Sequence, residues 1–278
     1  MGNCIYCGNA AGFLRKQHSE CRQAADNAKK AIGAAIHEAL HEGMSMERVR
    51  SVVDELARRS HVPDAAKRHV IVDQVTAVID QFLEDGILDQ SEENRIAELQ
   101  EKFALSQSDF ARTGAVEKVV KAATLRDVMN GELPDRLALK GAVPFNLQKG
   151  EKIVWAFPNA EYLEDKTRRQ YVGGSQGFSV RIAKGLYYRA GAFKGHSVER
   201  TERVSLGKGL LALSNKHILF SGADKTLRIP YSKIVAFQPF SDGIAIVRDA
   251  ASAKPQVFVT GDGWFTYNLA SNLSQIAA

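Results

Sequence analysis

The spacing of apolar residues changes from a helical to a strand pattern near Pro134 in this chain of 278 residues. Before Pro134, apolar residues recur every three or four positions, which is the period of an amphipathic helix. After it, short apolar or alternating runs are separated by turn residues, which is typical of β-strands. We therefore expect an α+β protein, in which an all-α bundle precedes an antiparallel β domain.

The helical part is predicted from periodicity and from capping residues. Apolar residues at i, i+3, i+4 and i+7 mark the second helix most clearly. Ser91 is expected to cap a helix that ends at Phe103, and Ser106 or Ser108 to cap a further short one. The predicted helices span residues 24–41, 46–60, 65–83, 91–103 and 115–129.

The second part is predicted to contain many short strands and one terminal helix. A glycine-rich run at residues 173–177 is expected to form the first hairpin turn. Strands closed by one helix predict an antiparallel β-barrel or sandwich, with the helix of residues 263–276 over an open end. The predicted strands span residues 153–157, 161–171, 178–183, 185–190, 199–206, 209–214, 217–221, 225–230, 234–239, 244–249 and 256–260.

All three cysteines lie in the first 21 residues, together with a histidine. Cys4 and Cys7 have the spacing of a tight metal-binding knuckle, and His18 and Cys21 are three positions apart at the expected start of a helix. Four such ligands complete a tetrahedral Zn²⁺ site and leave no position for water or substrate. We therefore expect a structural zinc ion rather than a catalytic one.

Unrelated thiols beside a histidine, or a disulfide, are the alternatives to a metal site. An odd number of cysteines without a secretory signal favours a reducing compartment, where thiolates persist as metal ligands. We therefore expect a cytoplasmic protein. Its expected parts are a zinc knuckle at residues 1–22, a helical bundle at 23–140 and a β domain at 150–278.

Positive charge is concentrated in the second half of the chain. Residues 151–278 contain 17 Lys and Arg against 10 Asp and Glu, a net charge of +7, whereas the remainder carries −2. Such an excess attracts the phosphates of lipid head groups or nucleic acid, although a charge of this size is most often a solvated surface. No apolar run is long enough to span a bilayer.

Two segments of the β part carry a recognisable pattern. They read GLLALSNKHILFSG at residues 209–222 and LRIPYSKI at residues 227–234. A strand, a Ser-Asn turn, a second apolar strand and an Ile-Pro-Tyr strand in this order resemble the GRAM and bacterial PH-like domains. The resemblance covers roughly residues 150–278, and it implies a small β-barrel capped by the helix that follows Trp264.

The helical part has a resemblance of its own. The segment LEDGIL at residues 83–88, followed by Glu92 and Glu93, looks like the Asp-Gly turn of TerB-like helical domains. The whole arrangement of zinc knuckle, helices and PH-like end resembles a group of bacterial proteins.

The PH-like resemblance implies recognition of a phosphoinositide, an anionic lipid surface or a peptide through basic residues at the mouth of the barrel. Paired cations beside a hairpin suit a phosphate group. Glu164 and Asp165 dilute the basic motif of the family, which is therefore only partly present. The candidate positions are Lys166, Arg168, Arg169, Arg181 and Lys184.

A literal H-E-x-x-H motif lies on the first predicted helix. His37 and His41 share a helix face and can bind Zn²⁺, with Glu38 as the general base of a metallopeptidase. The extended form of the motif is missing, because Met44 and Glu47 stand where Gly and His are needed. Two exposed histidines on a polar helix face are the alternative.

These patterns lead us to expect a non-enzymatic binding or adaptor protein. Its β domain would engage an anionic membrane surface, a peptide or a protein partner, so that the protein is cytoplasmic or peripheral at the inner membrane face. A zinc metallopeptidase is the alternative from the enzyme class. Nucleic-acid binding through the zinc knuckle is a third candidate, which is disfavoured because only Arg15, Lys16 and Arg22 are basic nearby.

Overall fold

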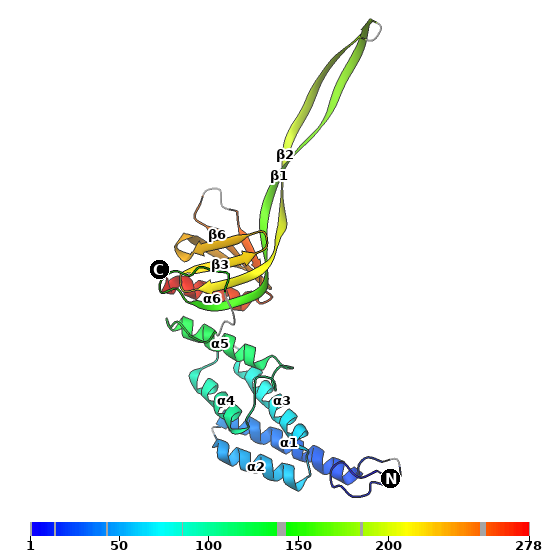
Figure 1. The fold of residues 1–278 in the computed structure, drawn as a ribbon, viewed down its shortest axis with the longest axis vertical. Coiled ribbons are helices and arrows are strands. Elements are labelled where there is room, and N and C mark those ends of the chain that lie inside the picture. The colour runs from blue at the N-terminus through cyan, green and yellow to red at the C-terminus, as the bar shows by residue number, and fades with distance from the viewer. Residues whose placement is uncertain are drawn as a thin grey trace. The chain divides into compact units, whose positions relative to one another are not determined.

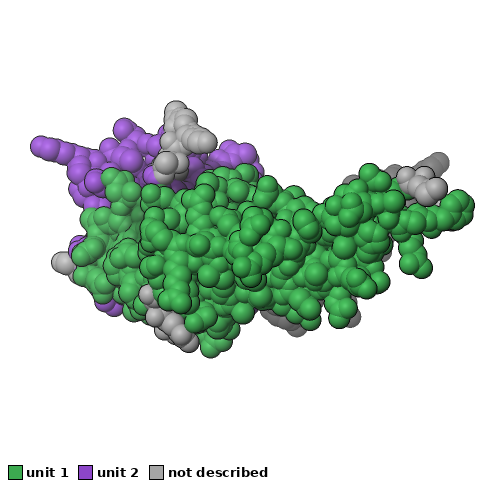
Figure 2. Space-filling view, turned by 90° about the horizontal axis from the view of Figure 1, so that it is seen from below, with its two compact units in different colours: residues 1–136 green, residues 137–278 purple. Residues whose placement is uncertain are grey.

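The computed structural model describes residues 2–13, 15–42, 44–84, 86–137, 143–183, 186–250 and 254–277, including their side chains except at residues 42 and 166–202. The chain divides into two compact units, Met1–Arg136 and Leu137–Ala278 (Figure 2). Helices form the first unit, and an antiparallel sheet with a C-terminal helix forms the second (Figure 1). The α+β class is therefore confirmed.

The described helices of the first unit pack their apolar stripes into one core. Ile32 and Ile36 from the first helix, Val53 from the second and Val75 from the third are completely buried there. The elements are α1 (Ser19–Glu42), α2 (Met46–Arg59), α3 (Asp64–Phe82), α4 (Gln90–Lys102) and α5 (Ala115–Met129).

Helix α4 is capped by Asp89 and not by Ser91. The Asp89 carboxylate accepts a hydrogen bond from the Glu92 amide (2.8 Å), and the Glu92 side chain accepts one from the Asp89 amide (2.9 Å). This reciprocal pair is a capping box, which satisfies two amides at the helix start. Ser91 instead donates its hydroxyl hydrogen to Asp89 (2.8 Å).

The short helix predicted after Ser106 or Ser108 is wrong, because residues 107–114 form turns. Asp109 orders them by accepting hydrogen bonds from the amide and the hydroxyl of Ser106 (both 2.7 Å). The Arg68 guanidinium also donates to Asp109 (2.7 Å), and these contacts hold the pKa of that carboxyl well below its usual range.

The second unit contains a seven-stranded antiparallel sheet, counted over the described residues, in the order β4-β3-β2-β1-β7-β6-β5. A 3₁₀ turn, η1 (Tyr231–Lys233), joins the two strands at opposite ends of this order. The strands are β1 (Ile153–Ala183), β2 (Leu186–Ser214), β3 (His217–Gly222), β4 (Thr226–Pro230), β5 (Ile234–Pro239), β6 (Gly243–Arg248) and β7 (Gln256–Val259).

The predicted closure into a barrel or sandwich is not confirmed. In the part of the chain that the structure describes, no backbone ladder joins β4 to β5, so the sheet is open. Each of these edge strands pairs with one neighbour, β4 with β3 and β5 with β6.

Strands β1 and β2 are much longer than the short strands predicted for this region. The glycine-rich run at residues 173–177 is not a turn but lies inside β1, where Gly173 pairs with Gly195 and Gly177 with Gly191. The last residue pair of the ladder is Ala183 with Leu186. Glycine permits a turn but does not require one, and here a continuous ladder satisfies the backbone groups.

The predicted C-terminal helix is confirmed as α6 (Gly263–Ile276), which packs against the sheet. Asp262 caps it by accepting a hydrogen bond from the Phe265 amide (3.1 Å). The Phe265 ring packs edge-on against Trp155 and Phe157 of β1, at centroid distances of 5.0 and 6.1 Å. Helix α6 also contacts β5 and β6.

Candidate metal centre and basic hairpin

The N-terminal knuckle is a compact loop that places Cys4 and Cys7 on one turn. The Gly8 amide donates to the Cys4 carbonyl oxygen (2.9 Å), with Gly8 in the left-handed region at φ 74°. The Cys4 amide donates to the Asn9 carbonyl oxygen (2.7 Å) and closes the loop. Glycine adopts this φ without strain, which explains why it follows the second cysteine.

His18 and Cys21 approach the knuckle from the start of α1. His18 directly precedes the helix, and its carbonyl oxygen accepts the amide hydrogen of Arg22 (3.1 Å). The Ile5 amide donates to the Lys16 carbonyl oxygen (3.0 Å) and holds the two segments together. The predicted ligands are thus brought together by the knuckle and by the first turn of one helix.

The four side chains fit a tetrahedral metal ion. The ligand atoms of Cys4, Cys7, His18 and Cys21 all lie within 4.8 Å of one another. His18 Nδ1 is 3.4 Å from the Cys7 sulfur and 3.6 Å from the Cys21 sulfur. A tetrahedron with Zn–S bonds of about 2.3 Å and a Zn–N bond of about 2.1 Å has an S···N edge of about 3.6 Å.

The hydrogen bond of His18 Nε2 leaves Nδ1 unprotonated, so that Nδ1 can bind a metal. Its Nε2 lies 3.0 Å from the Ala10 carbonyl oxygen, which can only accept, so the ring hydrogen is on Nε2. In the neutral ring, Nδ1 then presents a lone pair to the sulfur atoms. A backbone carbonyl is one of the usual hydrogen-bond partners for the far nitrogen of a metal-bound histidine.

The thiols of the cluster do not ionise alike. Burial raises the pKa of Cys4, but hydrogen bonds from the backbone of Cys7, His18 and Tyr6 outweigh this effect and lower it to about 6. Burial and the neighbouring Cys7 and Cys4 raise the pKa of Cys21 to about 11. Several thiolates so close together repel one another, so the cluster can ionise fully at neutral pH when a divalent cation neutralises it.

Helix α1 places His37 and His41 beside each other, with ring centroids 4.4 Å apart. His41 Nε2 is 3.0 Å from the Gln81 side-chain oxygen of α3, and the His41 ring meets Phe82 edge-on at 5.1 Å. Among the described residues, the one group of three or more metal-ligating side chains is the N-terminal cluster. The histidine pair is therefore without a third described ligand.

Four of the five predicted phosphate-binding residues lie on β1, beyond the segment of this strand that pairs with β7, which ends at Glu164. Lys166, Arg168 and Arg169 pair in register with Glu202, Arg200 and Glu199, and Arg181 pairs with Tyr187. Lys184 lies outside the described residues. From Asp165 onward β1 pairs with β2 alone, so these positions belong to a two-stranded ribbon (Figure 1).

This ribbon accounts for the positive charge of the chain. Residues 166–202 contain eight Lys and Arg against two Glu, a net charge of +6. The other residues contain 29 Lys and Arg against 30 Asp and Glu, a net charge of −1. The excess seen in the second half of the sequence is thus confined to one hairpin.

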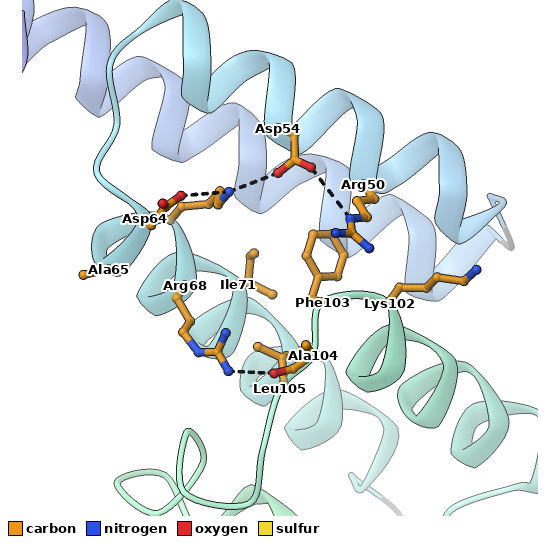
Figure 3. A pocket seen from close by; sticks show the side chains of 11 residues that line it. Arg50, Asp54, Asp64, Ala65, Arg68, Ile71, Lys102, Phe103, Ala104 and Leu105 are labelled. Atoms are coloured by element: carbon orange, nitrogen blue, oxygen red, sulfur yellow. Dashed lines mark hydrogen bonds and ion pairs between the residues drawn. The ribbon is translucent and has the colours of Figure 1, made fainter.

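A hollow of about 290 Å³ opens between α2, α3 and the turn after α4 (Figure 3). Its wall contains Arg50, Lys67, Arg68 and Lys102, each paired with a carboxylate. Lys67, for example, donates to Asp54 (3.0 Å) and lies 3.1 Å from Asp64. Because these cations are already neutralised within the unit, the hollow is a poor site for an anionic ligand.

A buried polar cluster at the start of β1 was not predicted. Glu151 accepts hydrogen bonds from the Ser214 hydroxyl (2.7 Å), His217 Nδ1 (2.8 Å) and the Gln148 amide (2.8 Å). Serine, histidine and carboxylate do not form a catalytic triad here, because the serine hydroxyl donates to the carboxylate and to the His217 backbone carbonyl and not to the imidazole ring. The members are 63 and 66 positions apart, so no local spacing reveals them.

No protein-family model matches the sequence, and comparisons with curated proteins and with solved structures found no match. The GRAM, PH-like and TerB-like resemblances therefore rest on sequence patterns. No helix in the described part of the chain is long and apolar enough to cross a membrane.

Proposed function

We propose that this chain is a non-enzymatic binding protein with a zinc-stabilised helical unit and a PH-like β unit that attaches to anionic membrane surfaces. The proposal rests on the distribution of charge: the two-stranded ribbon of residues 166–202 has a net charge of +6, whereas all other residues together have a net charge of −1.

The N-terminal cluster supports a structural role for the metal. Three sulfur ligands and one imidazole form a donor set that suits Zn²⁺ in a tetrahedral site. With four protein ligands the tetrahedron is full, and no position is left to activate water. The zinc would then hold the knuckle to the first turn of α1.

The order of the strands supports the PH-like assignment. The Ser-Asn turn of the resemblance joins β2 to β3, and its Ile-Pro-Tyr segment ends β4 and begins η1. Helix α6 contacts β1 in the middle of the sheet order as well as β5 at its end. A helix that packs across these strands is consistent with the capping helix of the resemblance.

Membrane attachment follows from the electrostatics of the ribbon. Each Lys or Arg near an anionic leaflet contributes about 1 kcal/mol of attraction, which falls off within a Debye length of about 8–10 Å. The ribbon carries eight such residues on a stretch that the rest of the sheet does not cover with strands.

Flotation of the full chain with lipid vesicles tests this function. We expect retention on vesicles that contain phosphatidylserine, release as salt is raised, and no retention on phosphatidylcholine alone. Substituting Lys166 and Arg168 by Gln should weaken retention more than substituting Arg112 and Lys118, which removes the same charge from exposed positions of the helical unit. No retention at low salt, or preference for duplex DNA or single-stranded RNA over vesicles, would overturn the proposal.

A further inference from the structure

The far end of the ribbon separates apolar from cationic positions. Successive residues of a strand lie on opposite faces, and the register between β1 and β2 pairs even-numbered with even-numbered positions. One face therefore carries the pairs Phe178 with Ala190 and Val180 with Tyr188. The opposite face carries the pairs Ser179 with Arg189 and Arg181 with Tyr187.

We propose that this end of the ribbon is an amphipathic anchor that lies in the interface of an anionic bilayer. The proposal rests on the membrane attachment proposed above and adds the face that meets the lipid. The face of Phe178, Val180, Tyr188 and Ala190 enters the boundary between head groups and acyl chains. Arg181 and Arg189, on the opposite face, remain at the level of the lipid phosphates.

The dimensions of a bilayer fit a ribbon one strand layer thick. Interfacial amphipathic elements bury their apolar face about 5–10 Å into the boundary between head groups and acyl chains. The polar layer of each leaflet is about 5–7 Å thick. With its backbone at this depth, the ribbon keeps one face in the acyl region and the other among phosphates, where arginine forms bidentate hydrogen bonds.

The unpaired backbone groups along the edges of the ribbon indicate that it lies on the membrane and does not cross it. Beyond Asp165 in β1 and Arg203 in β2, the described ladders pair these two strands only with each other. Their outer amides and carbonyls need water or head groups as partners, which the hydrocarbon core does not supply. An interfacial position satisfies them.

A partner on the ribbon would add to its stability, because beyond the sheet its two strands pair only with each other in the described ladders. An isolated two-stranded hairpin is marginally stable in water, and this one is about 60 Å long at about 3.3 Å per residue. An anionic bilayer stabilises both faces, because it attracts the cations electrostatically and removes the apolar residues from water. A nucleic acid would interact mainly with the cations and leave the apolar face in water. The apolar face therefore favours a lipid surface over a nucleic acid.

A pair of neighbouring substitutions tests the face assignment in the full chain. Phe178→Asp and Ser179→Asp change the net charge equally but fall on opposite faces of the ribbon. On phosphatidylserine vesicles we expect Phe178→Asp to lower the vesicle affinity at least about tenfold more than Ser179→Asp. The difference should persist at high salt, where electrostatic attraction is screened.

Quenching by brominated acyl chains gives an independent readout. In a Trp264→Phe background, the buried Trp155 gives the same emission in every variant, and we expect lipid bromine to quench the added fluorescence of Phe178→Trp and not that of Ser179→Trp. Equal losses of affinity from the two aspartates, or equal quenching at the two positions, would overturn the anchor while leaving membrane attachment intact. A wild-type chain that does not bind the vesicles would instead overturn the proposed function itself.

Discussion

A single carboxylate links the segment before β1 to the turn between β2 and β3. Glu151 is buried, and its oxygens accept hydrogen bonds from Ser214, His217 and the Gln148 amide. Burial raises the pKa of Glu151, but these hydrogen bonds and the nearby imidazole outweigh it and lower the pKa below its usual range. Ionised Glu151 therefore stabilises the folded β unit.

The pH dependence of unfolding should report this residue. Because the folded-state pKa lies below the unfolded value of about 4.3, the stabilisation is present above about pH 4.3 and is lost as pH falls through the folded-state pKa. We expect Glu151→Gln to flatten that acid slope and to cost about 1–3 kcal/mol at neutral pH.

Urea titrations at several pH values would measure this effect, with Trp155 and Trp264 as probes, since both tryptophans of the chain lie in the β unit. Asp249→Asn removes an exposed carboxyl from the same unit and serves as the control. Identical acid slopes for wild type and Glu151→Gln would contradict the role assigned to Glu151.

Single residues also show what the sequence could and could not predict. The clustering of Cys4, Cys7, His18 and Cys21 was predictable, because each pair is close in sequence and its spacing reflects one turn of backbone. The cap of α4 was assigned to Ser91 because serine is a good cap, yet Asp89 makes the reciprocal pair with Glu92. Glu151, Ser214 and His217 were not predictable, since the chain reverses twice before they meet.

At the scale of elements, the first residue of α6 is a glycine that packs closely against the backbone of the β5–β6 turn. A Cβ atom added to Gly263, the first residue of α6, would lie 1.9 Å from the Phe240 carbonyl oxygen and 2.8 Å from the Gly243 amide nitrogen. Both neighbours are backbone atoms, which cannot move aside as a flexible side chain can. The helix approaches the turn this closely because the residue has no side chain.

We therefore expect Gly263→Ala to push α6 away from the sheet and to lower the unfolding free energy of the β unit by about 1–3 kcal/mol. Thermal unfolding followed by tryptophan fluorescence would measure the loss. Gln275→Ala, at an exposed position of the same helix, should change the unfolding free energy by less than about 0.5 kcal/mol. A Gly263→Ala chain as stable as wild type would show that the contact is not tight.

The longest elements are the ones that local patterns predicted least well. The helices of the first unit were found from periodicity, because their hydrogen bonds are local. In β1, the glycines at residues 173–177 suggested a turn, whereas their pairing with residues 191–195 continues the strand. The pairing of a glycine run with another strand determines whether the run forms a turn or continues a strand. That partner lies too far away in the sequence for a local pattern to reveal it. Closure of the sheet depends in the same way on distant strands.

At the scale of the whole molecule, the candidate metal site and the sheet belong to different compact units. Within the first unit, the knuckle contributes Tyr6, a partly buried residue, to the edge of the helical core. Most of that core consists of contacts among α1–α5 that do not involve the ligands. Structural zinc contributes to folding chiefly where its ligands are, because the site does not exist in the unfolded segment.

Metal removal should therefore unfold one end of the molecule. We expect a chelator, or Cys4→Ser, to remove one tightly held zinc per chain. Amide protection should then be lost at residues 3–11 and in the first turn of α1, while amides of β3, β6 and α6 keep theirs. Hydrogen exchange with metal analysis would measure both effects. His41→Ala should retain the zinc. Zinc retained by Cys4→Ser, or loss of protection spread evenly over both units, would contradict a local structural role for this site.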